Sequence, residues 1–172
     1  MDGQPLENFP PNDVDAIVIR PASEFHVDTI GELWIKLVAY HRGLDDKLPE
    51  AAKDGGKLYA RRILDRLEDT HAQAFVAEKD GRVIGYVLGV IVDLVPEMFA
   101  QETGGFLADI FVEEAERGQS VGRKLVNALT EWFRSRGIAH IELYVASRNE
   151  SGRVFWQSVG GREIMRRIRI EL

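Results

Sequence analysis

The chain has 172 residues, of which 45% are hydrophobic and 29% charged, a balance typical of one globular domain with a continuous core. Its net charge of −6 argues against non-specific nucleic-acid binding, and the absence of cysteine excludes disulfides, thiolate metal sites and a thiol nucleophile. The polar start and the lack of a long apolar run indicate neither a signal peptide nor a membrane span. We therefore expect a cytoplasmic protein.

The N-terminal part of the sequence divides into an arm and the start of one domain. Residues 1–15 hold three prolines and no apolar period, which predicts a flexible arm ahead of a single domain at residues 16–172. The domain opens with a short apolar strand at residues 16–20. Apolar residues at three- and four-residue spacing then predict two helices, over residues 24–40 and residues 58–68, separated by a polar loop.

The middle of the chain reads as strands followed by a helix. Two strands, residues 73–78 and 82–92, flank the dipeptide Asp80-Gly81, which is typical of a tight hairpin turn. The second strand is apolar on both faces, so we expect it near the centre of the sheet. After a longer loop, a compact apolar run at residues 105–112 predicts a buried strand, and an amphipathic helix follows it.

The C-terminal part predicts a strand at residues 139–145, a short helix at 150–159 and a last, half-exposed strand at 162–172, where isoleucines alternate with charged residues. The resulting order, β-α-α-β-β-β-α-β-α-β, lacks the strict alternation of a dinucleotide-binding fold. Because the last strand has a free edge, we expect it to pair with a second copy in a symmetric homodimer.

The turn that precedes the amphipathic helix has the features of an anion site. Gly118 and Gly122 allow the backbone to pass close to a ligand, and the first amides of the helix point outward at the positive end of its dipole. Arg117, Arg123 and Lys124 add cations at a helix start, where they oppose the dipole unless an anion is present. These features predict a phosphate site built from backbone, although an ordinary strand-to-helix turn is the alternative for a short glycine motif.

Residues 17–172 resemble the GNAT superfamily of acetyl-CoA-dependent N-acetyltransferases. The superfamily's phosphate loop reads R/Q-x-x-G-x-G/A, and the run that starts at Arg117 fits it with Ser120 in place of the first patterned glycine. A second family stretch, an asparagine before a helix with an aromatic near its end, is matched by Asn149 and by Phe155-Trp156. The resemblance implies an α/β fold with a mixed, mostly antiparallel, twisted sheet of six to seven strands, flanked by four helices.

The resemblance also implies acetyl-CoA as cosubstrate, with its pantetheine arm along the strand at residues 105–112. The amide of Ile110, assisted by that of Val112, would hydrogen-bond the thioester carbonyl as an oxyanion donor. The other cofactor-binding positions that it implies lie on this strand, the loop and the two C-terminal helices: Phe111, Arg117, Gly118, Gln119, Ser120, Val121, Gly122, Arg123, Asn149, Phe155 and Trp156.

Within the superfamily, Phe106 to Val112 looks most like the diamine (polyamine) acetyltransferase branch. That branch has a proposed basic glutamate where Ala108 stands, and many members have a tyrosine acid where Trp156 stands, so neither role transfers. Asp109 matches the branch and could relay a proton or hold a cationic acceptor, but an acid at an exposed strand edge is an equal interpretation. We expect acetyl transfer to a primary amine, small and cationic. A protein or peptide acceptor and a non-catalytic acyl-CoA-binding regulator remain open.

Two further residues are candidates for proton transfer. His41 ends the first helix beside the expected acceptor cleft, where a histidine also suits a surface position or a partner for the helix dipole. Tyr144 is the first candidate for an acid in place of the missing family tyrosine. The other histidines are scattered without metal-ligand spacing, so we expect no metal site.

Overall fold

The computed structural model describes residues 16–172, and the arm expected at residues 1–15 lies outside the described residues. The elements, in chain order, are β1 (Val18–Pro21), the 3₁₀ turn η1 (Glu24–His26), α1 (Val27–Leu44), α2 (Gly55–Arg66), β2 (Ala72–Lys79), β3 (Arg82–Asp93), β4 (Thr103–Val112), the 3₁₀ turn η2 (Glu114–Glu116), α3 (Val121–Ser135), β5 (Ile141–Glu142) and α4 (Glu150–Ser158).

The sheet has five strands in the order β1-β2-β3-β4-β5, so β3 is central as its two apolar faces predicted. All neighbouring strands are antiparallel except β4 and β5, which run parallel. The β2–β3 hairpin turns at Asp80 and Gly81, with φ of 52° and 73°. Positive φ at both turn residues is the geometry that favours this dipeptide in tight hairpins, and the predicted turn is confirmed.

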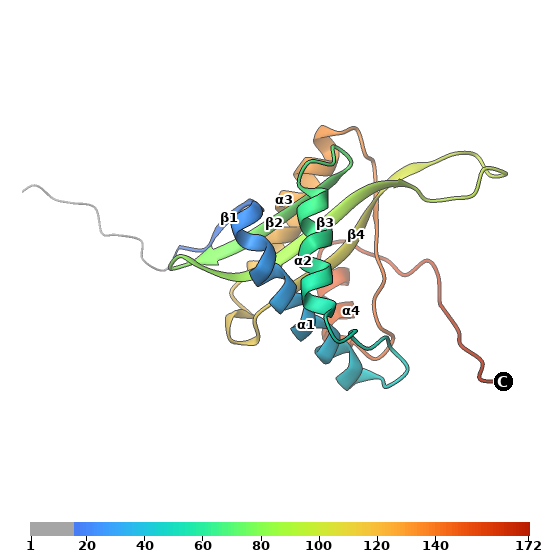
Figure 1. Ribbon diagram of the computed structural model, residues 1–172. Coiled ribbons are helices and arrows are strands. Elements are labelled where there is room, and N and C mark those ends of the chain that lie inside the picture. Colours follow the sequence, from blue (N-terminus) through green and yellow to red (C-terminus); the bar gives the residue numbers. More distant parts are fainter. Residues whose placement is uncertain (1–15) are drawn as a thin grey trace, which may run out of the picture.

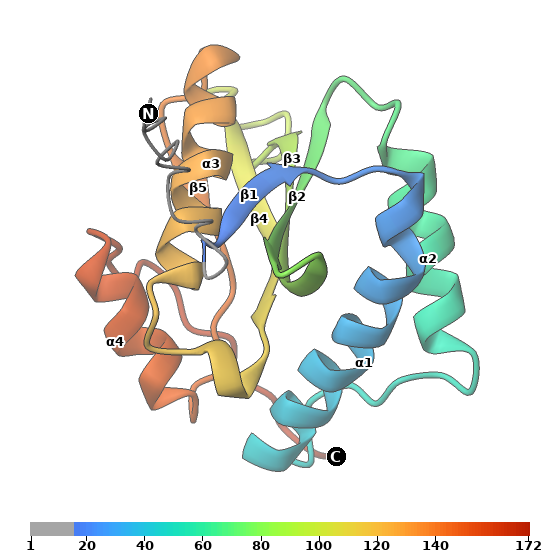
Figure 2. The same cartoon turned by 90° about the vertical axis from the view of Figure 1, so that its left-hand side faces the viewer.

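Helices cover both faces of the sheet. Helices α1 and α2 lie on one face, and α3 and α4 lie on the other (Figures 1 and 2). Each face has its own apolar cluster: one joins α1 and α2 to the sheet around Ile30, Ile63 and Tyr86, and the other joins α3 to the sheet around Leu125 and Leu129. The predicted α/β fold of mixed sheet and four helices is therefore confirmed.

The prediction of a last strand at residues 162–172 was wrong. The chain turns at Gly160 (φ 91°) and this segment forms no strand; its apolar side chains project into solvent, with Ile168 82% exposed. In Figure 1 the C-terminal segment runs clear of the sheet. Alternation makes a segment able to form a strand, but a strand also needs a partner edge, and β5 has only two paired residues where residues 139–145 were expected. The sheet consequently has fewer strands than the six to seven expected.

Candidate active site

One edge of β4 is open over most of its length. Strand β4 pairs with β5 only through Gly105 and Phe106, and beyond that point the two segments diverge. The amide of Glu113 donates to a β3 carbonyl (2.9 Å), so peptide direction alternates back along β4 from that contact. The peptide groups of Ile110 and Val112 therefore face away from β3, toward the edge where no strand of the described residues pairs with them.

A β-bulge interrupts β4 beside this open edge. Asp109 lies opposite Leu88 and Leu107 lies opposite Gly89, which leaves Ala108 as the extra residue. Ala108 packs against the cluster under α1 and α2, and Asp109 reaches a side chain of α2, so two consecutive residues face the same helical layer. A bulge changes which face side chains take in this way, and here it leaves both Ala108 and Asp109 on the face of the sheet that α1 and α2 cover.

The loop between β4 and α3 bends through two residues with left-handed backbone. Gly118 has φ of 78°, and Ser120, the residue before α3, has φ of 62° and ψ of 12°. Left-handed backbone strains any residue that has a Cβ, which gives a physical reason why the phosphate-loop pattern has glycine at the position of Ser120. The amides of the first turn of α3 then lack intrahelical partners, as a backbone anion site requires.

Glu116, which sequence analysis missed, braces this loop against the β2–β3 hairpin. The residue is only 7% exposed. Its carboxylate accepts hydrogen bonds from Lys79 (3.1 Å), Arg82 (3.3 Å) and Gln119 (3.2 Å). The Lys79 hydrogen bond is the main reason that the pKa of Glu116 lies below its usual value. The loop is therefore held by a charged brace that joins residues about 35 positions apart in the sequence.

The two arginines expected at the phosphate loop have partners of their own. The Nε of Arg117 donates to the Val112 carbonyl (3.1 Å), and its guanidinium lies over the rings of Tyr40 (5.2 Å) and Phe111 (5.5 Å). Arg117 thus caps part of the open β4 edge. Arg123 donates to the Ser158 hydroxyl (3.0 Å) and ties the start of α3 to the end of α4.

Helix α4 borders the open edge from the other side. The side-chain oxygen of Asn149 caps the helix by accepting from the Gly152 amide (2.9 Å), and it also lies 3.2 Å from the hydroxyl of Tyr40 on α1. A Cβ on Gly122 would lie 3.5 Å from the ring of Phe155, an ordinary contact. Glycine is thus not required here by packing within the protein, which leaves room for a ligand as the reason for it.

On the face of β4 that α1 and α2 cover, an acid of the strand and a tyrosine of α2 form a partly buried pair. The Tyr59 hydroxyl donates to Oδ2 of Asp109 at 2.7 Å. Burial raises the pKa of Asp109 to about 6, although the Tyr59 hydrogen bond and the charge of Arg62 lower it. Tyr59 stacks on Trp34, with ring centroids 5.0 Å apart. The site therefore places a carboxylate that changes charge near neutral pH next to a stacked pair of aromatic rings.

The model of the acetyltransferase (GNAT) family matches residues 39–160. The chain belongs to this family. The GNAT chain is 27% identical over 152 residues to an uncharacterized N-acetyltransferase of Methanocaldococcus jannaschii, which covers 88% of the chain and 63% of the relative. The chain thus spans less than two thirds of the length of that relative.

Solved structures share the GNAT fold over nearly their whole length. A Bacillus halodurans protein, solved as a mutant, superposes with a TM-score of 0.81 at 18% identity, covering 90% of this chain and 99% of that one. An aminoglycoside N-acetyltransferase in complex with CoA superposes with a TM-score of 0.71 at 21% identity, covering 95% and 99%. At such identities the likeness supports the architecture alone.

The remaining residues predicted for proton transfer in this GNAT protein make no hydrogen bond to the acid within residues 16–172. His41 is partly buried on α1, and burial lowers its pKa. Tyr144 is 85% exposed and rests edge-on against Phe106, with centroids 5.3 Å apart. No hydrogen bond among residues 16–172 joins either side chain to Asp109, so the described contacts give Asp109 a different partner, Tyr59.

Two absences hold for the part of the chain that the structure describes. It contains no group of three or more histidine or acidic residues placed to hold a metal ion. Every helix in it is too short or too polar to cross a bilayer.

Proposed function

We propose that this protein transfers the acetyl group of acetyl-CoA to a primary amine. The observation that carries the proposal is the open edge of β4, with the peptide groups of Ile110 and Val112 facing it and a left-handed loop and helix start at its end. An extended pantetheine arm can pair with such an edge as an added strand does, and a pyrophosphate suits the free amides of α3.

The chemistry follows from the positions along β4. The Ile110 amide donates to the thioester oxygen as negative charge develops there, while the amine nitrogen bonds to the carbonyl carbon and the carbon–sulfur bond breaks. Asp109, whose side chain lies on the face of β4 that α1 and α2 cover, accepts the amine proton. The sulfur leaves as a thiolate, whose conjugate acid has a pKa of about 8.5 in simple thiols, so a separate acid at Trp156 is not essential.

A small cationic amine is the acceptor that we propose. A carboxylate beside stacked aromatic rings attracts cations, and Asp109 with Trp34 and Tyr59 has this composition. The likeness of Phe106 to Val112 to the diamine branch supports the same class. Two structural neighbours are aminoglycoside N-acetyltransferases, whose acceptors are also cationic amines, and one was solved with a CoA-linked bisubstrate analogue.

Release of free CoA tests the proposal. The protein is incubated with acetyl-CoA and a panel containing diamines, polyamines, aminoglycosides and a peptide with a free N-terminus, and the thiol is measured with a chromogenic reagent. Amine-dependent release with cationic amines supports the proposal, and release only with the peptide shifts it to a protein or peptide acceptor. Acetyl-CoA binding by calorimetry with no release for any amine would establish an acyl-CoA-binding regulator and contradict it.

We further propose that the protein forms a homodimer through its C-terminal segment. The alternating apolar side chains of residues 162–172 are exposed, and β5 has a free outer edge to which such a segment can add. Light scattering at micromolar concentration should give the mass of a dimer, and removal of residues 162–172 should give a monomer. A full-length monomer would contradict the proposal.

A further inference from the structure

We propose that Tyr59 is a positioning residue that holds the Asp109 carboxylate ready to take the amine proton. This inference rests on the proposed function, because it gives Asp109 a partner in that reaction. Its first support is the short hydrogen bond from the Tyr59 hydroxyl to Oδ2 (2.7 Å). The two residues lie 50 positions apart and meet because Tyr59 of α2 and the side chain of Asp109 lie on the same face of the sheet.

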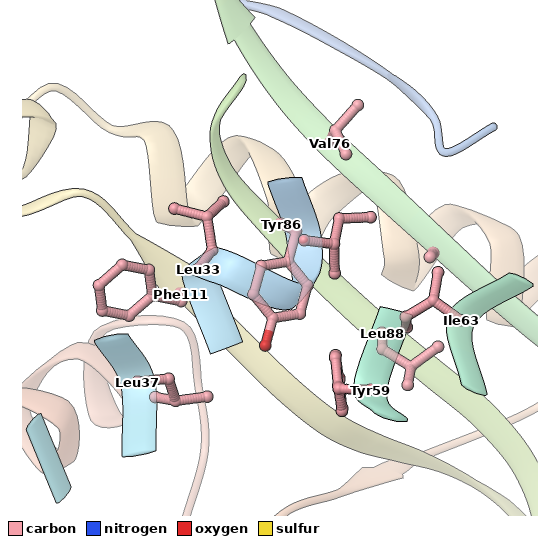
Figure 3. Packing of buried hydrophobic residues seen from close by; sticks show 10 residues of the cluster. Leu33, Leu37, Tyr59, Ile63, Val76, Tyr86, Leu88 and Phe111 are labelled. Carbon is pink, nitrogen blue, oxygen red and sulfur yellow. The ribbon is translucent and has the colours of Figure 1, made fainter. Parts of the chain in front are cut away.

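Tyr59 is itself held in place by two neighbouring rings. Its ring stacks on Trp34 with an interplanar angle of 11° and meets the edge of Tyr86 at 6.2 Å, and the residue is only 8% exposed. Figure 3 shows Tyr59 and Tyr86 in the packed layer between the helices and the sheet. A side chain fixed in this way can hold a carboxylate oxygen at one position, which a mobile surface group cannot do.

The hydroxyl of Tyr59 acts only as a donor. Burial, together with the neighbouring Tyr86 and the Asp109 carboxylate, raises the pKa of Tyr59 far above its usual range, so the hydroxyl keeps its proton. Tyr59 therefore cannot serve as the acid or the base of the reaction. It occupies Oδ2 and leaves Oδ1, to which no hydrogen bond is made within residues 16–172, for the incoming amine.

The same hydrogen bond keeps the carboxylate ionised. The groups that face Asp109 are Tyr59 and Arg62 from α2 and Tyr86 from β3, while α1 faces the cluster with Trp34 and with leucines that carry no charge. Burial favours the neutral acid, and the Tyr59 hydrogen bond and the Arg62 charge oppose it. Loss of the Tyr59 hydroxyl should therefore raise the pKa of Asp109 and lower the fraction of enzyme with an ionised Asp109 carboxylate at neutral pH.

Tyr86 provides a matched control. Its hydroxyl is buried in the same cluster but has no hydrogen-bond partner among the described residues. Tyr59→Phe and Tyr86→Phe therefore delete the same group from the same layer and keep both rings, but only the first breaks a bond to Asp109. Packing effects should be similar in the two variants, and effects on the carboxylate should not.

The test is a carbon-13 NMR titration of the Asp109 carboxyl in the wild type and both variants, with the pH profile of kcat/KM for an active amine. In Tyr59→Phe the carboxyl titration and the acidic limb of kcat/KM should both move to higher pH by about one unit. In Tyr86→Phe, which breaks no hydrogen bond to Asp109, both shifts should be clearly smaller. An unchanged carboxyl titration in Tyr59→Phe, or equal shifts in both variants, would overturn the inference.

The two measurements also separate this inference from the proposed function. A selective shift of the carboxyl titration in Tyr59→Phe, with no amine acetylated by the wild type, would support the Tyr59–Asp109 coupling and contradict the acetyltransferase proposal. Amine acetylation by the wild type, with an Asp109 carboxyl titration that is unchanged in Tyr59→Phe, would support the acetyltransferase proposal and contradict the Tyr59–Asp109 coupling.

Discussion

The open edge of β4 and the face of β4 that α1 and α2 cover present different kinds of chemical group. On the open edge, the groups we assign to the cofactor are backbone: the peptides of Ile110 and Val112 and the first amides of α3. On the face that α1 and α2 cover, the groups we assign to the acceptor are side chains: Asp109 of β4 and Tyr59 of α2, which meet through a hydrogen bond. Ligand binding at the open edge, which we call the backbone face, should depend on φ angles and on space for a ligand. Ligand binding on the face that α1 and α2 cover, which we call the side-chain face, should depend on single hydrogen bonds and burial.

The largest expected effect comes from removing the carboxylate. Asp109→Asn keeps an acceptor for Tyr59 but cannot take a proton, so kcat should fall by roughly a hundredfold to ten-thousandfold, the range of general bases. The affinity for CoA, measured by calorimetry, should not change. Asp93→Asn, which alters an exposed acid bonded to Thr103 at the far end of β3, is the control and should keep kcat. Loss of CoA affinity in Asp109→Asn would show that the two faces are not independent.

Gly122→Val should have the converse effect. A Cβ at this position meets only the Phe155 ring at ordinary distance, so the variant should fold, while its side chain fills space beside the helix start to which we assign the phosphate. CoA affinity should fall roughly a hundredfold, equivalent to about 2.7 kcal/mol. The NMR titration of the Asp109 carboxyl should stay as in the wild type. A folded Gly122→Val protein that binds CoA normally would move the cofactor away from this loop.

The sequence predicts the geometry of the loop before α3 much better than the pairing of Tyr59 with Asp109. A glycine-bearing loop between a strand and a helix is a local pattern: the left-handed angle at Ser120 occurs where the family pattern has glycine, and the one at Gly118 occurs at a glycine of this chain. The pair of Tyr59 and Asp109 depends on a bulge and on the packing of α2, neither of which has a local signature. Tyr59 reads in the sequence as one member of an apolar helical stripe.

At the C-terminal segment, by contrast, a local pattern is present but the contact it predicts is absent. Residues 162–172 have a strong local pattern for a strand, but pairing is a property of two segments, and β5 pairs with β4 through only two residues. Local periodicity predicted the hairpin at Asp80-Gly81 because both of its strands adjoin the turn. It could not predict which edge, if any, would accept the last segment.

The charge of Asp109 should also appear in stability. Its pKa is raised on folding to about 6, so the neutral form favours the native state, and that stability is present at low pH and lost as pH rises through about 4 to 6. Asp109→Asn should therefore be more stable than the wild type above pH 7, by about 3 kcal/mol, and equal to it near pH 4. Urea unfolding at both pH values measures this. A less stable variant at pH 8 would contradict the assigned burial.

The smallest effect is expected at Ser120. Ser120→Gly relieves the left-handed strain at a cost in unfolded-state entropy, for a net gain of about 1 kcal/mol in the free energy of unfolding. CoA affinity should stay the same or improve. Ser120→Ala, which keeps the Cβ, should give no such gain. Equal stability of the glycine and alanine variants would show that the backbone angle is not the reason for glycine in the loop pattern.

One measurement tests the division of the site most directly. CoA is added to isotope-labelled protein, and an amine active in the CoA-release assay is then added to this complex, which has no acetyl group to transfer, with amide and carboxyl NMR signals followed at each step. The account predicts that the cofactor shifts the amides of Ile110, Val112 and Gln119 to Gly122, and that the amine then shifts the Asp109 carboxyl. An amine that leaves the Asp109 signal unmoved, or a cofactor that leaves the β4 amides unmoved, would contradict it.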